Sequence, residues 1–285
     1  MRGVFAFCAW NLPVTGNLRV ERRDGAAIVT MERAPVNGLT PDFVAELDAT
    51  RRTLEAEGIG AAILASGAAG TFCAGADAAW VAAGAAGAGG SEAFVAEFER
   101  FTGELTALAH AMHDGPILWI AAIGGHCIAG GLELAMACDL RVCAAEGVTF
   151  AFPELRMFGA SPTGAGALQE VARAAGRSRT IALVTSGERF GPAEALAWRL
   201  VDEVVPASEL AERAFTRAKT IAAAPVAGAI LQLKAALRGA DLPPDDARAL
   251  DRRVFLEQLH GPAFPAGLDA FARRFGRGAS SKGKS

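Results

Sequence analysis

The chain of 285 residues is 52% hydrophobic and 21% charged, which supplies enough apolar material for a large core and excludes a disordered protein. Its net charge is −3, so it lacks the basic surface that binds nucleic acid without regard to sequence. No apolar run reaches the roughly 18 residues that a membrane-spanning helix needs. We expect one large domain with an appendage.

The first 17 residues are expected to form a loose N-terminal extension. Arg2 precedes an apolar stretch at residues 4–10, but no small-residue cleavage site follows, so the pattern does not fit a signal peptide. The cysteines are odd in number and lie among apolar neighbours, which favours core residues in a reducing compartment over a disulfide framework. A cytoplasmic location is therefore predicted. The cysteines are Cys8, Cys73, Cys127, Cys138 and Cys143.

A hairpin followed by a helix is predicted at the start of the folded part. Asp24 and Gly25 separate segments 18–23 and 26–32, and Asp-Gly is a strong signal for a two-residue hairpin turn. The helix is expected to begin at Pro41, because threonine precedes this proline and makes a good N-cap.

Two buried strands are predicted at residues 60–65 and 117–123, because both are short apolar runs next to turn-forming residues. Between them lies a helix with one continuous apolar stripe, which we expect to face the core rather than an external partner. Residues 82–90 (AAGAAGAGG) have almost no side chains to pack and are predicted to be a mobile loop. The stripe consists of Phe94, Phe98, Phe101, Leu105, Leu108 and Met112.

Strand and helix patterns alternate as far as residues 201–205, which predicts an α/β fold with a largely parallel sheet. After Pro206 the pattern becomes helical only, with helices expected at 207–223, 226–238 and 245–259. The polar tail is expected to be disordered.

No cofactor or metal site is predicted. The dinucleotide fingerprint G-x-G-x-x-G does not occur despite 33 glycines. His110 and His113 lie one helical turn apart, but no cluster of cysteine or carboxylate offers further metal ligands, so a solvated helix end is the preferred interpretation.

Three segments with small and acidic residues are the candidates for chemistry: residues 71–77, 124–134 and 150–154. Small residues at strand ends let backbone N–H groups approach a ligand closely, as in an oxyanion hole. Glu133 lies in the first turn of a predicted helix, and Glu154 follows in the third segment. Two carboxyl groups brought together push their pKa values apart, so one can act as a base and the other as an acid. In isolation, a glutamate in the first turn of a helix more often serves to stabilise the helix dipole, and this is the preferred interpretation of either residue taken alone.

In combination, these segments resemble those of the crotonase superfamily, the enoyl-CoA hydratases and isomerases, over about residues 18–276. Five matches occur in the order that the family shows. They are residues 33–39 (RAPVNGL), 72–77 (FCAGAD), 129–135 (AGGLELA) with Cys138 and Asp139 after it, 185–188 (TSGE) with 193–195 and 200–201, and 267–271 (GLDAF).

The resemblance implies an acyl-CoA lyase, in the first place an enoyl-CoA hydratase that adds water to a 2-trans-enoyl-CoA. By analogy, the backbone N–H groups of Ala76 and Gly130 polarise the thioester carbonyl. Glu133 is expected to activate the water and Glu154 to deliver a proton to the alpha carbon. No separate cofactor is implied, because coenzyme A arrives as part of the substrate. The expected substrate contacts are Ala34, Val36, Ala74, Asp77, Trp80, Gly131 and Pro153.

The resemblance also implies an α/β fold, the crotonase (ClpP-like) spiral of repeated ββα units with a helical C-terminal trimerisation region. Homotrimers, or hexamers built as dimers of trimers, are the expected assembly. Phe215, Leu231 and Phe255 could serve such an interface or the core of the chain itself. The expected division is residues 1–17 extension, 18–205 core with the active site, 206–275 helical region and 276–285 tail.

Two departures from the family pattern keep other reactions open. The chain is one residue longer than is usual between Cys138 and Phe150, and again between Glu154 and Gly159. A double-bond isomerase, an acyl-CoA decarboxylase, or a CoA-binding scaffold without catalysis are therefore alternatives. Arg156 is expected at the surface near the site, where it could also contact a substrate carboxylate or a CoA phosphate.

Overall fold

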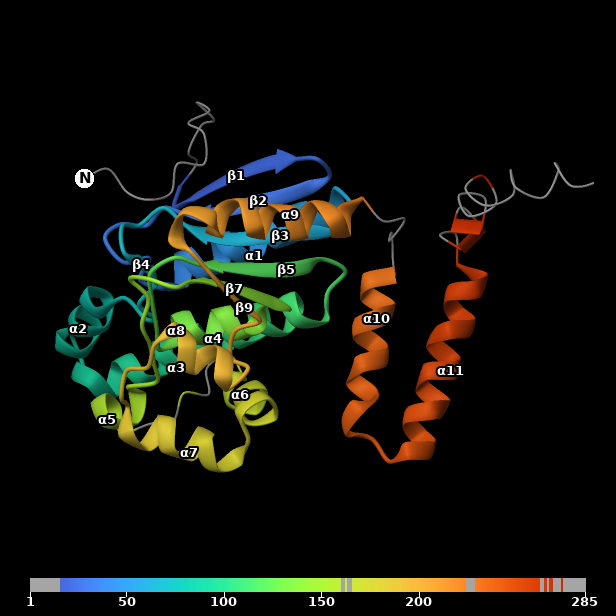
Figure 1. Ribbon diagram of the computed structural model, residues 1–285. Helices are drawn as coiled ribbons and strands as arrows, with labels where there is room; N and C mark the ends of the chain where they lie inside the picture. The colour runs from blue at the N-terminus through green and yellow to red at the C-terminus, as the bar shows by residue number, and fades with distance from the viewer. Residues whose placement is uncertain are drawn as a thin grey trace, which may run out of the picture.

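A six-stranded sheet forms the centre of the structure, a computed structural model that describes residues 16–159, 162, 166–223, 229–261, 264–265, 267–268 and 273. Its order is β1-β2-β3-β5-β7-β9 (Figure 1). β1 pairs antiparallel with β2, and the other neighbours run parallel, which confirms the predicted largely parallel sheet. The strands are β1 (Leu18–Arg23), β2 (Ala26–Met31), β3 (Ala61–Ser66), β5 (Leu118–Ile123), β7 (Leu140–Ala144) and β9 (Glu203–Val205).

A second, three-stranded parallel sheet has the order β4-β6-β8. Each of its strands follows a strand of the main sheet and is itself followed by helix, as in β5-β6-α4 and β7-β8-α5. The chain therefore repeats a strand–strand–helix unit, as predicted. The elements are β4 (Thr71–Cys73), β6 (His126–Ile128), β8 (Phe150–Ala151), α4 (Gly130–Ala137) and α5 (Glu154–Phe158).

Local sequence signals explain the first elements. Asp24 and Gly25 both have positive φ, 50° and 80°, as a primed hairpin turn between β1 and β2 requires. Thr40 has extended backbone and accepts a hydrogen bond from the Phe43 N–H, so it caps α1 (Pro41–Ala56) as predicted.

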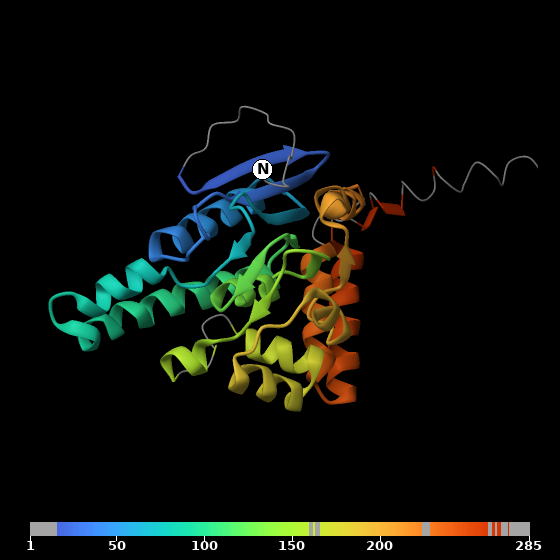
Figure 2. The same ribbon diagram turned by 60° about the vertical axis from the view of Figure 1, so that its left-hand side comes forward.

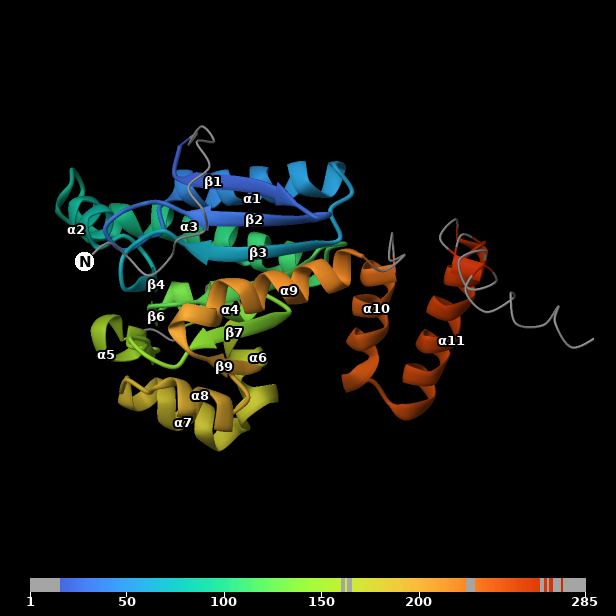
Figure 3. The same ribbon diagram turned by 45° about the horizontal axis from the view of Figure 1, so that its top comes forward.

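Helices cover both faces of the main sheet. α9 (Leu210–Ala222) contacts β2, β3, β5 and β7 and crosses one face, as Figure 3 shows from above. α1 and α3 (Gly90–Asp114) lie behind the sheet in Figure 1. Every residue of β2 and β3 is buried. Strands covered on both faces are rich in apolar residues, as these two are. The remaining helices are α6 (Ala167–Ala175), α7 (Arg177–Ser186) and α8 (Pro192–Ala197).

The prediction of a loop at residues 82–90 is wrong for most of this range, because α2 (Ala78–Ala86) is helical and extends into it. Alanine has the highest helix propensity, and the helix packs on α3 through the ring of Trp80. The Trp80 ring centroid lies 5.1 Å from that of Phe94 and 4.9 Å from that of Phe101. Gly84 is needed for this packing, since a Cβ there would lie 2.2 Å from the Phe94 ring. The α2–α3 pair projects to the left in Figure 2.

The apolar stripe of α3 faces the interior, which confirms the prediction of a core face. Phe94, Phe101, Leu105, Leu108 and Met112 are buried, and Phe98 is half-buried.

The described part of residues 206–275 contains only helices, as predicted, but its first helix belongs to the core. α9 buries Phe215 and three other residues against the sheet. α10 (Ala229–Leu237) and α11 (Pro244–His260) form a hairpin at the side of the core (Figure 1). Leu231 and Phe255 on these two helices are exposed in the single chain.

Lys234 anchors α10 to the core. Its buried ammonium donates to the carbonyl oxygens of Met112 and Ile117, at 2.9 and 2.8 Å, and pairs with Asp139 at 2.8 Å. All three donors of the ammonium thus have partners, which makes the burial of the charge tolerable.

Several expectations concern residues outside the described ones, namely the extension up to residue 15, Cys8 and the tail at 276–285. The other four cysteines are free thiols and buried, as predicted. A search of the described helices finds none that is both long and apolar enough to cross a bilayer. The cytoplasmic location stays a prediction.

Candidate active site

The three predicted segments meet at one edge of the small sheet. β4, β6 and β8 are adjacent and parallel, so the residues that follow their carboxyl ends lie side by side. These are the turn after Cys73, the start of α4 after Ile128, and the start of α5 after Ala151. Ligands of parallel α/β sheets bind at such carboxyl edges.

The first two segments touch backbone to backbone through two glycines. A Cβ on Gly75 would lie 2.9 Å from the nitrogen of Gly130, and a Cβ on Gly131 would lie 2.2 Å from the carbonyl oxygen of Cys73. Gly75 also has a φ of +86°, which favours glycine. Only glycine fits at these two positions. Because Gly75 lies against Gly130, Ala76 and Gly130 are close to each other in space.

The backbone N–H groups of Ala76 and Gly130 have no acceptor among the residues that the structure describes. Leu39 donates its N–H to the Gly75 carbonyl and accepts from the Asp77 N–H, both at 2.8 Å. This parallel bridge uses the residues on either side of Ala76 and leaves the Ala76 N–H out. Gly130 is the first residue of α4. Within the described part of the chain, neither N–H donates a hydrogen bond. Two amides are thus available to an external acceptor.

Ala129 has an unusual backbone conformation immediately before α4. Its φ of 53° and ψ of −131° are sparsely populated for a residue with a Cβ, and no side chain caps the helix here. Such strain is typical of functional sites, where it fixes the direction of neighbouring groups. The helix N-terminus adds a positive end of the helix dipole at the same point.

Glu133 and Glu154 lie on the two helices that begin at this edge. Glu133 lies in the first turn of α4 and is only 4% exposed. Glu154 opens α5, and both of its carboxyl oxygens are buried without a hydrogen-bond partner among the described residues. Desolvation raises the pKa of Glu154 to about 7, and the charge of Glu133 adds to the increase, while the backbone N–H of Glu154 opposes it. A carboxyl that holds its proton near neutral pH can act as a general acid.

The predicted substrate contacts fall into two groups. Ala34 and Val36 are exposed in the loop before α1, and Ala74 and Pro153 are partly exposed beside the site. The Ala74 N–H donates to the Val36 carbonyl at 3.1 Å, so the loop lies against the first site segment. These four residues are accessible to a ligand.

Asp77, Trp80 and Gly131 instead make contacts within the protein. Gly131 packs on Cys73, and Trp80 lies among the phenylalanines of α3 and donates its indole N–H to Glu97. Asp77 caps α2 through the Trp80 N–H and pairs with Arg33. These two interactions lower the pKa of Asp77. Ligand contact by these three residues stays a prediction.

Two polar residues beside the site were not identified as functional from the sequence. Asn37 is completely buried and donates to Ser66 and to the Phe72 carbonyl, both at 2.8 Å, which ties the loop to β4. Arg33 reaches Asp77 from 44 positions away. Both lie in the RAPVNGL match, but no local pattern reveals their partners.

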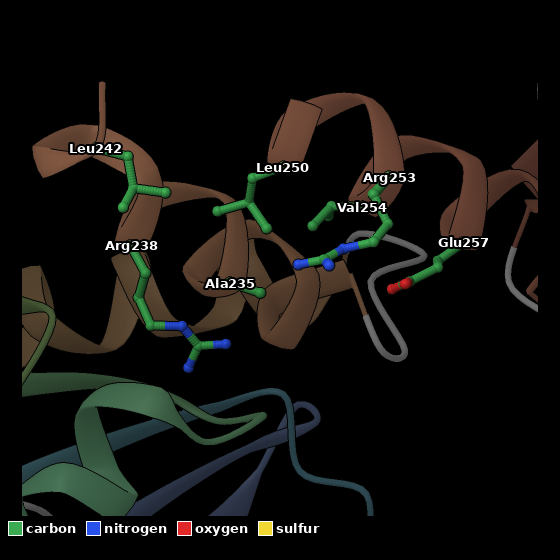
Figure 4. Close-up of a pocket in the computed structure, with 7 residues that line it drawn as sticks. All are labelled: Ala235, Arg238, Leu242, Leu250, Arg253, Val254 and Glu257. Carbon is green, nitrogen blue, oxygen red and sulfur yellow. The ribbon is translucent and has the colours of Figure 1, made fainter. Parts of the chain in front are cut away.

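Two cavities border the C-terminal helices and lie away from this edge. One, of about 480 Å³, lies between α10 and α11, and Figure 4 shows its lining of leucines with Arg253 and Glu257. The other, of about 540 Å³, includes His110, His113 and Lys234. Within the described ranges, no group of three or more histidine, cysteine or acidic residues could hold a metal ion.

Comparison with known proteins agrees with this arrangement. The sequence profile of the enoyl-CoA hydratase/isomerase family matches residues 21–276. The "Probable enoyl-CoA hydratase echA8" of Mycobacterium bovis is 30% identical over 256 residues, which cover 90% of this chain and 94% of that protein. The "Probable enoyl-CoA hydratase" of Rhizobium meliloti is 30% identical over 258 residues, covering 90% and 95% of the two chains.

Solved structures show the same fold. The enoyl-CoA hydratase of Bacillus anthracis superposes with a TM-score of 0.78 at 25% identity and covers 91% of this chain and 97% of its own. DspI of Pseudomonas aeruginosa gives 0.77 at 28% identity, with 93% and 97% covered. The predicted crotonase-type α/β fold is therefore confirmed. Because the family profile spans most of the sequence, the chain belongs to the enoyl-CoA hydratase/isomerase family.

Proposed function

We propose that the protein is an enoyl-CoA hydratase, which adds water across the double bond of a 2-trans-enoyl-CoA to give a 3-hydroxyacyl-CoA. The observation that carries the proposal is the burial of the Glu154 carboxyl group together with its raised pKa. Its carboxyl oxygens are buried without a partner among the described residues, and its pKa is raised to about 7 beside a second glutamate. A proton donor next to a carboxylate base is what hydration of a polarised double bond needs.

The first task of the site is to polarise the thioester carbonyl. The backbone N–H groups of Ala76 and Gly130 are the proposed donors, supported by the contact of their two segments and by their free hydrogen-bonding capacity. Negative charge that develops on the carbonyl oxygen would be stabilised by these amides and by the N-terminus of α4. Loss of one such donor typically costs about 2.7–4 kcal/mol of transition-state stabilisation.

The second task is proton transfer. In the proposed step, Glu133 takes a proton from water as the water oxygen bonds to the beta carbon, and electron density moves to the thioester carbonyl. Glu154 then gives its proton to the alpha carbon, which restores the carbonyl and leaves the 3-hydroxyacyl product. Each positioned acid or base contributes roughly 100- to 10,000-fold to the rate.

The acyl-CoA substrate is proposed to lie along the accessible residues beside the site. Ala34 and Val36 are exposed in the loop before α1, with Ala74 and Pro153 next to them. Small and apolar side chains leave room for the pantetheine arm. Coenzyme A enters as part of the substrate, so the reaction needs no further cofactor.

A double-bond isomerase is the second candidate. A single carboxyl with a pKa near 7 can both accept a proton from one carbon and return it to another, and Glu154 has this property. Such a reaction would not need Glu133 as a base.

The test measures formation of 3-hydroxyacyl-CoA from crotonyl-CoA and from longer and branched enoyl-CoAs. Hydration requires both carboxyl groups, so Glu133→Gln and Glu154→Gln are each expected to lower kcat by at least about 100-fold. Glu99→Gln, at an exposed position of α3, is the control and should retain full activity. Absence of hydration with all acyl chains, or full hydration by either site variant, would rule the proposal out. Double-bond migration that survives Glu133→Gln would favour the isomerase.

We also propose that the chain assembles as a homotrimer or as a dimer of trimers. Support comes from the large apolar side chains that α10 and α11 expose in the single chain, among them Leu231, Leu237 and Phe255. Light scattering after gel filtration tests this assembly, and a monomer at micromolar concentration would contradict it.

A further inference from the structure

An ion pair beside the oxyanion segment joins two parts of the chain that are far apart in sequence. The Arg33 guanidinium donates through Nη1 to the Asp77 carboxylate at 2.6 Å and to the Gly38 carbonyl at 2.8 Å. The other carboxylate oxygen of Asp77 accepts the Trp80 N–H at 2.8 Å. Arg33 thus connects the loop before α1 to the start of α2.

The ion pair holds the residue that follows Ala76. Asp77 follows Ala76, and its own N–H donates to Leu39, which in turn donates to Gly75. Gly38 has no room for a Cβ, because such an atom would lie 2.9 Å from the Asp77 carboxylate. Leu39 therefore holds the residues on both sides of Ala76, and the Arg33–Asp77 ion pair, which we call the charged clamp, adds a further contact at Asp77.

We propose that Arg33 and Asp77 are positioning residues that fix the direction of the Ala76 N–H for the bound thioester carbonyl. The inference rests on the proposed function of the site. It gives Asp77 a role different from substrate contact, since both of its oxygens already have partners within the protein. The side chains of Arg33 and Asp77 are only 26% and 18% exposed, so solvent weakens the pair less than it weakens a surface ion pair.

The variants separate the charged clamp from the helix cap. Asp77→Asn keeps an amide oxygen that can accept the Trp80 N–H, but removes the charge that holds Arg33. Arg33→Gln removes the clamp from the other side, and Arg33→Lys restores a cation that can reach one acceptor at a time. Arg22→Gln is the matched control, because Arg22 of β1 forms an ion pair of similar length with Glu57, the residue that follows α1.

The readout is the carbonyl stretching frequency of bound butyryl-CoA that carries ¹³C at the thioester carbon, measured by infrared difference spectroscopy. This saturated thioester cannot be hydrated, so the frequency reports polarisation of the carbonyl alone. In the wild type and in Arg22→Gln, binding should lower the frequency relative to free butyryl-CoA. Arg33→Gln and Asp77→Asn should lose part of this shift, and Arg33→Lys should recover some of it.

Kinetics provide the second readout. Both clamp variants should lower kcat for crotonyl-CoA about 10- to 100-fold, less than the roughly 100- to 1,000-fold loss on removal of a whole oxyanion donor. The Kd for butyryl-CoA should change by less than about twofold, whereas a residue that binds coenzyme A directly would weaken the Kd in parallel with activity. Circular dichroism confirms folding, and Asp77→Asn carries the test if Arg33→Gln does not fold.

The outcomes distinguish this inference from the proposed function. A wild-type protein that binds neither butyryl-CoA nor a longer or branched saturated acyl-CoA, or binds them without a carbonyl shift, overturns both. A shifted wild-type carbonyl that stays unchanged in both clamp variants overturns the inference alone, as does a weakened Kd with unchanged kcat.

Discussion

The carboxyl group of Glu154 is buried within electrostatic range of Glu133, and the two groups come from helices that follow neighbouring strands of one small sheet. Burial contributes most to the raised pKa of Glu154, and the charge of Glu133 adds to it. The Glu154 carboxyl can therefore keep its proton at a higher pH than an ordinary glutamate does.

The first prediction concerns the pH dependence of the proposed hydration. Glu154 must carry its proton to act as an acid, and its pKa is about 7. The value of kcat/KM should therefore fall about tenfold per pH unit above this pKa, as Glu154 loses its proton. Steady-state rates with crotonyl-CoA from about pH 5.5 to 9 measure this profile. Activity that stays level up to pH 9 would show that no acid with this pKa takes part.

The second prediction concerns stability and follows from the same shift. The folded-state pKa of Glu154 is raised from 4.5 to about 7, so its proton stabilises the fold fully below about pH 4.5, and this stabilisation is lost as pH rises to about 7. Glu154→Gln cannot ionise. Its free energy of unfolding should exceed that of the wild type by an amount that grows over this window and then levels off, on the order of 3 kcal/mol.

Urea unfolding of the wild type and Glu154→Gln at about pH 4.5, 6 and 8 measures this difference. Glu99→Gln serves as the control, because residue 99 is exposed on α3, and its effect should be small at every pH. A difference for Glu154→Gln that shrinks with increasing pH would contradict the sign of the shift.

Elements with strong local signals could be predicted from the sequence. The Asp24-Gly25 turn, the capped start of α1 and the apolar stripe of α3 all depend on neighbours within a few positions, and the structure confirms them. The convergence of three segments could be anticipated because each follows a strand of one parallel sheet.

Features that depend on distant partners were not predictable. The alanines and glycines of residues 82–90 have almost no side chains to pack and so predict a loop, whereas the ring of Trp80 holds α2 on α3. The Arg33–Asp77 pair spans 44 positions, and no spacing rule relates the two residues. The sequence predicted Glu154 as a site residue. It could not predict that both carboxyl oxygens are buried without a hydrogen-bond partner among the described residues, because this depends on neighbours in space.

The third prediction concerns the contact between the segments that carry Ala76 and Gly130. In Gly131→Ala, the new Cβ would lie 2.2 Å from the carbonyl oxygen of Cys73, so the backbone must shift. A shift of about 1 Å at the site is expected to lower kcat/KM about 100-fold and to cost roughly 1–3 kcal/mol of stability. Gly103→Ala is the control, because a Cβ at this exposed position of α3 meets nothing within 4 Å. It should raise stability by up to about 1 kcal/mol without a change in rate. Equal effects of the two substitutions would contradict the tight contact.

The fourth prediction concerns the buried ion pair that attaches α10 to the core. Lys234→Met would leave the Asp139 carboxylate buried without its cation, and would leave the carbonyl groups of Met112 and Ile117 without their donor. Burial already raises the pKa of Asp139 while Lys234 opposes this effect, so removal of the lysine should raise that pKa further. Loss of one partner of a buried pair costs about 3–5 kcal/mol.

Urea unfolding at one fixed chain concentration measures the loss, because association of subunits would otherwise change the apparent stability. Arg52→Met is the matched control: Arg52 also pairs with an aspartate, Asp48, but its side chain is 72% exposed. This control should change the free energy of unfolding by less than about 1 kcal/mol. The double variant Lys234→Met/Asp139→Asn should be more stable than Lys234→Met alone, because it no longer buries an unpaired charge. A double variant less stable than the single one would contradict the unpaired Asp139 charge as the source of the loss.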